Sequence, residues 1–149
     1  MNNIFAHLIH FLATGLYSGK IPYAPGTAGS LLAVILLKFY SGFKSPLSIL
    51  LFSAAGIYIC SYEAKRTGIK DKGEVVIDEI TGIFLVFLNI PLSPLNLVLG
   101  FSLFRIFDIV KPGPIDSSQH LPSGLGVMAD DLLAALTTLL IMNFFLYIT

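Results

Sequence analysis

The chain has 149 residues, of which 55% are hydrophobic and only 12% are charged, and its mean hydropathy is +0.83. This composition argues against an ordinary soluble domain, and the formal net charge of zero argues against the basic surface that nucleic-acid binding requires. The length fits one domain, residues 1–149. All nine acids lie within residues 63–79 or 108–131, so we expect a membrane protein with one polar face.

Residues 4–17 begin the chain with an apolar stretch in which His7, His10 and Thr14 recur at helical spacing. We predict an amphipathic helix that lies at the membrane interface with these three residues toward water. The segment has no basic region before its apolar stretch and no clear small-residue cleavage site, so we expect it to be retained.

Five apolar runs follow, separated by short loops. They cover residues 28–43, 46–62, 75–90, 95–110 and 129–148. The alternating pattern of a membrane β-barrel does not occur, and helices satisfy their own backbone groups in lipid, so all five are predicted to be helices. A 16-residue helix measures roughly 24 Å, less than the ~30 Å hydrocarbon core, so several must lie in a thinned bilayer or against other helices. The expected fold is all-α: a bundle of about five short apolar helices plus the N-terminal amphipathic helix.

Five successive crossings would place the connecting loops alternately on two sides of the membrane. The loops before residue 28, at 63–74 and at 111–129 then share one side, and loops 41–46 and 89–94 share the other. All nine acids and most Lys and Arg residues fall on the first side, which the positive-inside rule assigns to the cytoplasm. Acids more than fifty residues apart thereby become neighbours, unless one of the segments is re-entrant.

Two polar pairs have simple structural interpretations. Asp78 and Glu79 open the third run, where carboxylates would cost several kcal/mol if they faced lipid, but acids at a helix start also complement its dipole. Arg105 and Asp108 are three residues apart and share one helix face, as a structural ion pair would. Neither pair by itself establishes a functional site.

Asp130 and Asp131 are harder to explain as structural residues. Two adjacent carboxylates at the head of an apolar helix repel each other, and this repulsion favours a nearby cation. With the other acids on the same face, oxygen ligation of a hard cation such as Mg²⁺ becomes the best single explanation. The predicted catalytic and metal-binding residues are Asp78, Glu79, Asp108, Asp130 and Asp131.

Residues 22–30 introduce the first apolar run with glycines, hydroxyl groups and helix-start N–H groups. Such a segment can bind an anion, although Thr27 or Ser30 could equally cap a helix. Beside carboxylates suited to Mg²⁺ and the cations Arg105 and Lys111, the segment indicates phosphate chemistry. We predict that Thr27, Ser30, Arg105 and Lys111 bind the substrate phosphate.

Four motifs in chain order carry a resemblance to a known family. They are Pro25-Gly26-Thr27 with Gly29-Ser30, Asp78-Glu79 with Gly82, Phe104 to Ile109 with Lys111-Pro112 and Pro114-Ile115, and Gly126-Val127-Met128 with Asp130-Asp131. Over roughly residues 12–135 the chain resembles the phosphatidylglycerophosphatase A family. One departure is visible, because the family commonly has Gly after the Ala that follows the aspartate pair, where this chain has Ala135.

The resemblance implies a Mg²⁺-dependent, multi-pass enzyme of the bacterial inner membrane, with its active face toward the cytoplasm. It implies removal of the terminal phosphate of phosphatidylglycerophosphate to give phosphatidylglycerol. The expected partners are a lipid phosphomonoester substrate and membrane lipids, whereas nothing in the sequence supports an oligomer. The residues alone do not distinguish phosphatidylglycerophosphate from phosphatidate.

Other phosphatase mechanisms fit the sequence less well. Cys60 lacks the loop and nearby arginine of a cysteine phosphatase, and no histidine follows Pro122-Ser123-Gly124, which superficially resembles the histidine-dependent lipid phosphatases. Attack by metal-activated water remains, with a transient aspartyl-phosphate as the less favoured variant. We expect Cys60 itself to be a buried, inert thiol.

A cation transporter or channel subunit is the alternative from another functional class, because intramembrane carboxylates also mark ion pathways. Transport requires polar groups near the middle of the bilayer. The central parts of the five runs contain no charged residue, which disfavours this alternative; they are residues 31–37, 47–59, 83–88, 95–101 and 132–142.

Overall fold

The computed structural model describes residues 3–148, which form seven α-helices and two 3-10 helices and contain no strand. In chain order the elements are α1 (Asn3–Ala13), η1 (Ser18–Lys20), α2 (Pro25–Phe39), η2 (Ser41–Lys44), α3 (Pro46–Thr67), α4 (Ile77–Val86), α5 (Pro94–Val110), α6 (Pro114–Ser118) and α7 (Gly124–Ile148). The predicted all-helical fold is confirmed. The short α6 lies in a segment predicted to be a loop, and α7 begins five residues before its predicted start at 129.

Local sequence signals set the helix boundaries. Proline occupies the first helical position of α2, α3, α5 and α6, where its missing N–H costs no intrahelical hydrogen bond. The side chains of Ser45 and Ser93 cap α3 and α5 by accepting hydrogen bonds from the N–H groups of Ser48 and Asn96. Gly68, in the left-handed conformation, ends α3.

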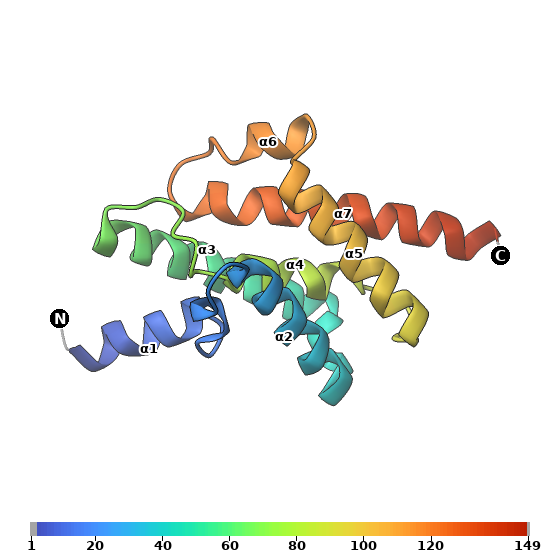
Figure 1. The fold of residues 1–149 in the computed structure, drawn as a ribbon, viewed down its shortest axis with the longest axis horizontal. Helices are drawn as coiled ribbons and strands as arrows, with labels where there is room; N and C mark the ends of the chain where they lie inside the picture. The colour runs from blue at the N-terminus through green and yellow to red at the C-terminus, as the bar shows by residue number, and fades with distance from the viewer. Residues whose placement is uncertain (1–2, 149) are drawn as a thin grey trace.

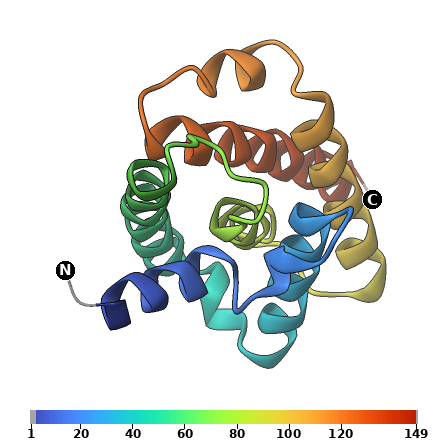
Figure 2. The same cartoon turned by 60° about the vertical axis from the view of Figure 1, so that its left-hand side comes forward.

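Helix α4 is the central element of the bundle, with the longer helices arranged around it (Figure 2). It has ten residues and measures about 15 Å, so it is shorter than the predicted helix 75–90 and cannot span a bilayer by itself. Eight of its residues are buried, which means that protein and not lipid surrounds it. Gly82 lets α5 approach closely, because a Cβ there would lie 2.8 Å from the ring of Phe104.

The connecting loops divide between the two ends of the bundle (Figure 1). At one end, where α2, α4 and α7 begin and α3 ends, the Lys70 Nζ donates to the carbonyls of Gln119 and Leu121 at 2.5 and 2.7 Å. At the opposite end, the Lys44 Nζ donates to the carbonyl of Ile90 at 2.5 Å. The predicted grouping of loops therefore holds within the molecule, while its orientation across a membrane stays a prediction.

Much of the lateral surface is apolar. Helices α3 and α7 are long and apolar enough to cross a membrane, with mean hydropathies of 1.5 and 1.8. Large apolar side chains are exposed on other helices too, for example Leu31 of α2 at 52% and Val98 and Ile109 of α5 at 64% and 69%. Such a continuous apolar exterior is typical of a helical membrane protein, which agrees with the sequence-based expectation.

The N-terminal helix is amphipathic as predicted, and His7 is exposed as predicted, but the prediction that His10 and Thr14 face water is wrong. Its polar side turns toward the protein: Thr14 is fully buried, and His10 Nδ1 lies 3.3 Å from a carboxylate oxygen of Glu63. The exposed side is apolar, with Ile4 81% exposed. The prediction failed because Glu63, assigned to a loop, lies in α3 at 1% exposure and provides a polar partner inside the fold.

The aromatic centre of the bundle provides a test of this packing. Phe84 of α4 is fully buried and lies against Phe43 and Phe52, with ring centroids 5.2 and 5.1 Å away. We expect Phe84→Ala to lower the free energy of unfolding by about 3–5 kcal/mol, because it leaves a cavity at the centre of the bundle. Phe39→Ala, at an 85% exposed position, is the control and should change it by less than about 0.5 kcal/mol. Denaturant unfolding in detergent would measure both, and equal effects would contradict the described core.

Candidate active site

Three carboxylates from two helices converge at one end of the bundle. Asp78 and Glu79 lie in the first turn of α4, and Asp131 lies in the second turn of α7. One oxygen atom from each of these three side chains lies within 4.8 Å of the other two. The packing of α4 on α7 produces this arrangement.

Two of these carboxylates are buried, Glu79 is half-buried, and all three are incompletely paired. Asp78 is 5% exposed and Asp131 is 3% exposed. Within residues 3–148, Asp78 Oδ1, Glu79 Oε2, Asp131 Oδ2 and Asp130 Oδ1 are buried without a hydrogen-bond partner. Unpaired buried carboxylate oxygens are costly, and neighbouring negative charges increase that cost. A set of carboxylate oxygens fits a hard divalent cation such as Mg²⁺, which would compensate for this charge.

The other two predicted metal ligands contact cations of the protein. The Arg105 NH1 group donates to Asp108 Oδ2 at 2.5 Å, and Lys111 Nζ donates to Asp130 Oδ2. Asp108 and Asp130 thus lie beside the three-carboxylate cluster and interact electrostatically with Asp131. The structure brings all five predicted acids to one region, three of them at the spacing of metal ligands.

Gly26, in the first turn of α2, lies against the cluster. A Cβ at this position would collide with Glu79 Oε1 and lie 3.1 Å from the Arg105 NH1 atom. Arg105 Nε is buried and, in the described part of the chain, has no hydrogen-bond partner. The Arg105 guanidinium group therefore lies between Asp108, Glu79 and the backbone of Gly26. The sequence motif identified Gly26, but only the structure shows that its missing side chain makes room for Glu79 and Arg105.

The two hydroxyl residues predicted to bind phosphate lie in the same part of α2. Ser30 is fully buried, and its hydroxyl donates to the Gly26 carbonyl at 2.8 Å, so its O–H group is already engaged within the helix. Thr27 is half-buried in the first turn. Ala24, the N-cap residue, makes no side-chain cap, and first-turn N–H groups have no intrahelical acceptors. The amides of Gly26 and Thr27 can therefore bind an anion, while the phosphate-binding roles of Thr27 and Ser30 stay predictions.

Two further residues have the environments that the sequence suggested. Cys60 is 2% exposed, as expected for a buried thiol. Ala135, where the chain departs from the family motif, is fully buried in the main apolar core.

The family profile described as phosphatidylglycerophosphatase A matches residues 11–146. The chain is 40% identical to phosphatidylglycerophosphatase A of Haemophilus influenzae over 139 residues, which cover 89% of this chain and 85% of the relative. It is 37% identical to phosphatidylglycerophosphatase A of Escherichia coli over 142 residues, covering 91% of this chain and 81% of the relative.

A third relative has a different name. The chain is 39% identical over 134 residues to a Bacteroides thetaiotaomicron protein provisionally named a phosphatidylinositol-3-phosphatase, covering 83% of this chain and 84% of the relative. No solved structure gives a significant match. The family match and the first two relatives agree with the motifs around the carboxylate cluster, and the chain therefore belongs to the phosphatidylglycerophosphatase A family.

Proposed function

We propose that this protein is a Mg²⁺-dependent lipid phosphatase that hydrolyses the terminal phosphomonoester of phosphatidylglycerophosphate to give phosphatidylglycerol and inorganic phosphate. Family membership and the names of two relatives support the reaction. The observation that carries the proposal is the cluster of Asp78, Glu79 and Asp131, whose buried oxygens lack partners in the described chain beside two cationic side chains.

Asp78, Glu79 and Asp131 are the residues that would hold Mg²⁺, with Asp108 and Asp130 close enough to contribute further ligands or to orient Arg105 and Lys111. When bound, Mg²⁺ would supply charge neutralisation at the phosphoryl group and would lower the pKa of water. The carboxylates would thereby lose the mutual repulsion that they have without a cation.

The remaining groups of the site suit the binding and cleavage of a phosphomonoester. Arg105 and Lys111 would neutralise its non-bridging oxygens, and the N–H groups of Gly26 and Thr27 would donate to the same phosphate. A water molecule attacks phosphorus, the bond from phosphorus to the glycerol oxygen breaks, and that oxygen takes a proton. One of the five acids would accept the proton that the attacking water loses.

The lipid part of the substrate has a suitable surface beside this site. A groove of about 190 Å³ lies between α2 and α5, and it is lined by Leu31, Val34, Leu97, Val98, Phe101 and Ser102. Leu31 follows Thr27 by one helical turn, and Phe101 precedes Arg105 by one turn. An acyl chain in this groove would leave its headgroup near Gly26 and Arg105.

We further propose that the protein crosses the bacterial inner membrane several times with this site toward the cytoplasm, as the distribution of Lys and Arg indicates. The alternative function, cation transport, is disfavoured by the apolar side chains of α4. Beyond Glu79 this central helix continues through Ile80, Ile83 and Phe84, which are at most 3% exposed and apolar. Beyond Glu79, α4 therefore offers no charged side chain to an ion path toward the opposite end.

The substrate assignment can be tested with the detergent-purified protein. We expect release of inorganic phosphate from phosphatidylglycerophosphate in the presence of Mg²⁺, and none with EDTA. Phosphatidate and phosphatidylinositol 3-phosphate, the latter suggested by the name of the third relative, should react at least about tenfold more slowly. Equal rates would contradict the narrow specificity, and no release from any of the three lipids by well-folded protein would contradict the phosphatase function.

Asp131 is the residue whose substitution best separates catalysis from stability. We expect Asp131→Asn to lower kcat at least about 100-fold, because it removes a ligand, and Asp130→Asn to have a similar effect. Without Mg²⁺, Asp131→Asn should stabilise the protein by on the order of 1 kcal/mol, because one of several neighbouring negative charges is removed. Phosphate release and thermal unfolding measure the two effects, and a folded Asp130→Asn/Asp131→Asn double variant with near-normal turnover would contradict the mechanism.

Mg²⁺ binding can be measured separately from activity. At a Mg²⁺ concentration about 100 times the Kd, the wild-type protein should gain about 2.7 kcal/mol of stability. The same addition should not stabilise Asp131→Asn, whereas Asp116→Asn, which alters an exposed acid of α6, should respond as the wild type does. An equal Mg²⁺ response in Asp131→Asn would place the metal site elsewhere.

Gly26→Ala tests the close contact between α2 and the cluster. Alanine is a better helix former than glycine, so the substitution should not weaken α2 itself. Its Cβ would displace Glu79 and Arg105, and a displacement of about 1 Å can lower kcat by about 100-fold. Ala28→Gly, in the same turn, provides the opposite exchange as a control for helix propensity. Near-normal turnover of Gly26→Ala would contradict the described contact.

A further inference from the structure

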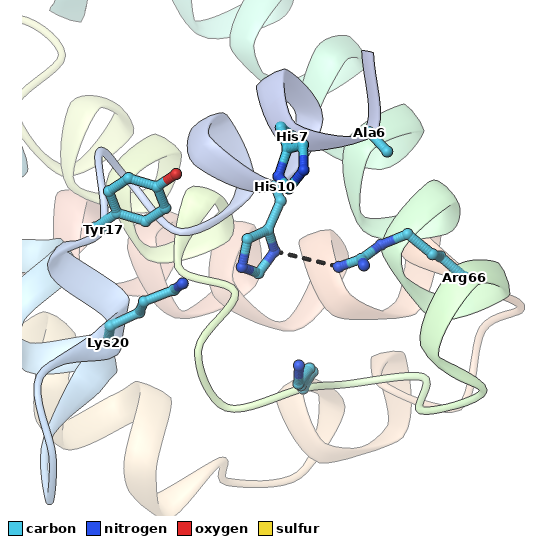
Figure 3. A pocket seen from close by; sticks show the side chains of 7 residues that line it. Ala6, His7, His10, Tyr17, Lys20 and Arg66 are labelled. Atoms are coloured by element: carbon cyan, nitrogen blue, oxygen red, sulfur yellow. Dashed lines mark hydrogen bonds between the residues drawn. The ribbon is translucent and has the colours of Figure 1, made fainter. Parts of the chain in front are cut away.

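A second polar cavity, of about 570 Å³, lies beside the N-terminal helix. It is enclosed by α1, the turn before η1, the end of α3 and the loop after it, as Figure 3 shows. Its lining residues are Ala6, His7, His10, Tyr17, Lys20, Arg66 and Lys72. Five of these seven are Lys, Arg or His, and none of them belongs to the proposed catalytic site.

The charges around this cavity leave an excess of positive charge. Two of its cations pair with acids: Arg66 with Glu63 at 2.6 Å, and Lys72 with Glu74 at 2.5 Å. The hydrogen bond from Lys72 lowers the pKa of Glu74, so this acid is ionised at neutral pH. Lys20 remains without an acid in ion-pair contact in the described chain, and its Nζ lies 4.6 Å from the centre of the Tyr17 ring.

Histidine side chains add donors to the same cavity. His10 lies between the two acids, with Nδ1 3.3 Å from Glu63 and Nε2 3.7 Å from Glu74. The Arg66 NH2 group also lies 3.3 Å from His10 Nδ1, the contact that is drawn in Figure 3. Together with exposed His7, these groups form a surface of nitrogen donors that suits an oxyanion and not a metal cation.

The backbone that forms one wall of the cavity is strained. Three successive residues, Gly15, Leu16 and Tyr17, have φ angles of 52°, 55° and 68°, a conformation that side-chain-bearing residues rarely adopt. Hydrogen bonds from Leu16 N to Phe11 O and from Gly19 N to Thr14 O, both 3.0 Å, fix the turn. Such strain persists where the surrounding structure enforces it and is common at binding sites. Here it directs Tyr17 and Lys20 toward the cavity.

The surroundings of the cavity indicate what kind of molecule could carry an oxyanion into it. The outer side of α1 exposes apolar residues, including Ile4, Leu8 and Leu12 at 81%, 53% and 39%. An exposed apolar side of this kind can be buried at the boundary between lipid headgroups and acyl chains. The cavity on its polar side would then be at the depth of lipid headgroups, and acyl chains could lie along the apolar side.

We propose that this cavity binds the phosphate-bearing headgroup of an anionic phospholipid at a non-catalytic site, with Lys20 and Lys72 contacting the phosphate and Tyr17 covering it. The bound lipid would hold α1 at the membrane interface. Lys20 has no acid in contact within the described chain and Lys72 can turn from Glu74, so both can reach a phosphate without breaking the Arg66–Glu63 pair. The site does not depend on the proposed hydrolysis.

Native mass spectrometry of the full-length protein in a neutral detergent can test this proposal. The probes are dioleoyl-phosphatidylglycerol, dioleoyl-phosphatidylcholine and inorganic phosphate, none of which carries the phosphomonoester that the proposed reaction cleaves, and every sample carries Asp131→Asn to weaken binding at the proposed catalytic site. We expect the phosphatidylglycerol adduct to form at a concentration at least about tenfold lower than the phosphatidylcholine adduct. Because binding is read directly, failure of the phosphatase proposal would leave this test unaffected.

The decisive comparison uses two double variants with the same change of charge. Lys20→Ala/Lys72→Ala removes two cations from the cavity, whereas Lys38→Ala/Lys65→Ala removes two exposed lysines that do not line it. The first should weaken phosphatidylglycerol binding at least about tenfold, and the second less than about twofold. Equal losses, or no loss in the first variant, would overturn the proposal, as would inorganic phosphate binding as tightly as the lipid.

A single substitution tests whether weaker lipid binding could result from unfolding of the variant. Lys20 is exposed, and Lys20→Ala removes its contact with Tyr17 and a longer-range attraction to Glu74, so the thermal unfolding midpoint should stay close to that of the parent protein. It should still weaken the binding of phosphatidylglycerol about threefold or more. A well-folded Lys20→Ala variant with unchanged lipid affinity would remove Lys20 from the site and overturn the proposed contact.

Discussion

Repulsion among buried carboxylates is the constraint on which the site depends. Asp78, Glu79 and Asp131 meet at the packed ends of α4 and α7, where water cannot solvate them fully and several of their oxygens have no partner within the described residues. Arg105 and Lys111 offset part of this charge through Asp108 and Asp130. In the proposed function, the remaining negative charge would bind a divalent cation, which would in turn hold the phosphomonoester of a lipid.

The short central helix makes this arrangement compatible with a membrane. Because α4 is enclosed by other helices, it can begin with two acids below the surface of the bundle, while the surrounding helices present apolar residues to lipid (Figure 2). Glycines at positions 26 and 82 bring α2 and α5 close to α4 at this end. The acids would thus contact a headgroup without facing the acyl chains themselves.

The same end of the molecule also carries the cationic cavity beside α1. Between the two sites lies a smaller apolar cluster, which includes Ile9 and Ala13 of α1, Val75 before α4 and Met128 of α7. Within the described residues no ion pair joins the cationic lining to the acids of the site, so each site keeps its own charged groups. One face of the protein would therefore attract both a divalent cation and an anionic headgroup.

The all-helical fold, the grouping of the loops and the candidate acids of the site could be predicted from the residues alone, because long apolar runs, proline and glycine boundaries and the position of charge depend on local chemistry. The sequence did not determine the length of α4, the burial of Glu63 or the inward orientation of His10 and Thr14. These depend on which surfaces pack together: protein around α4 removes the need to span lipid, and an acid on α3 gives the polar side of α1 a partner. Distances between acids on different helices were likewise decided only by the tertiary structure, because packing brings together residues that are far apart in the chain.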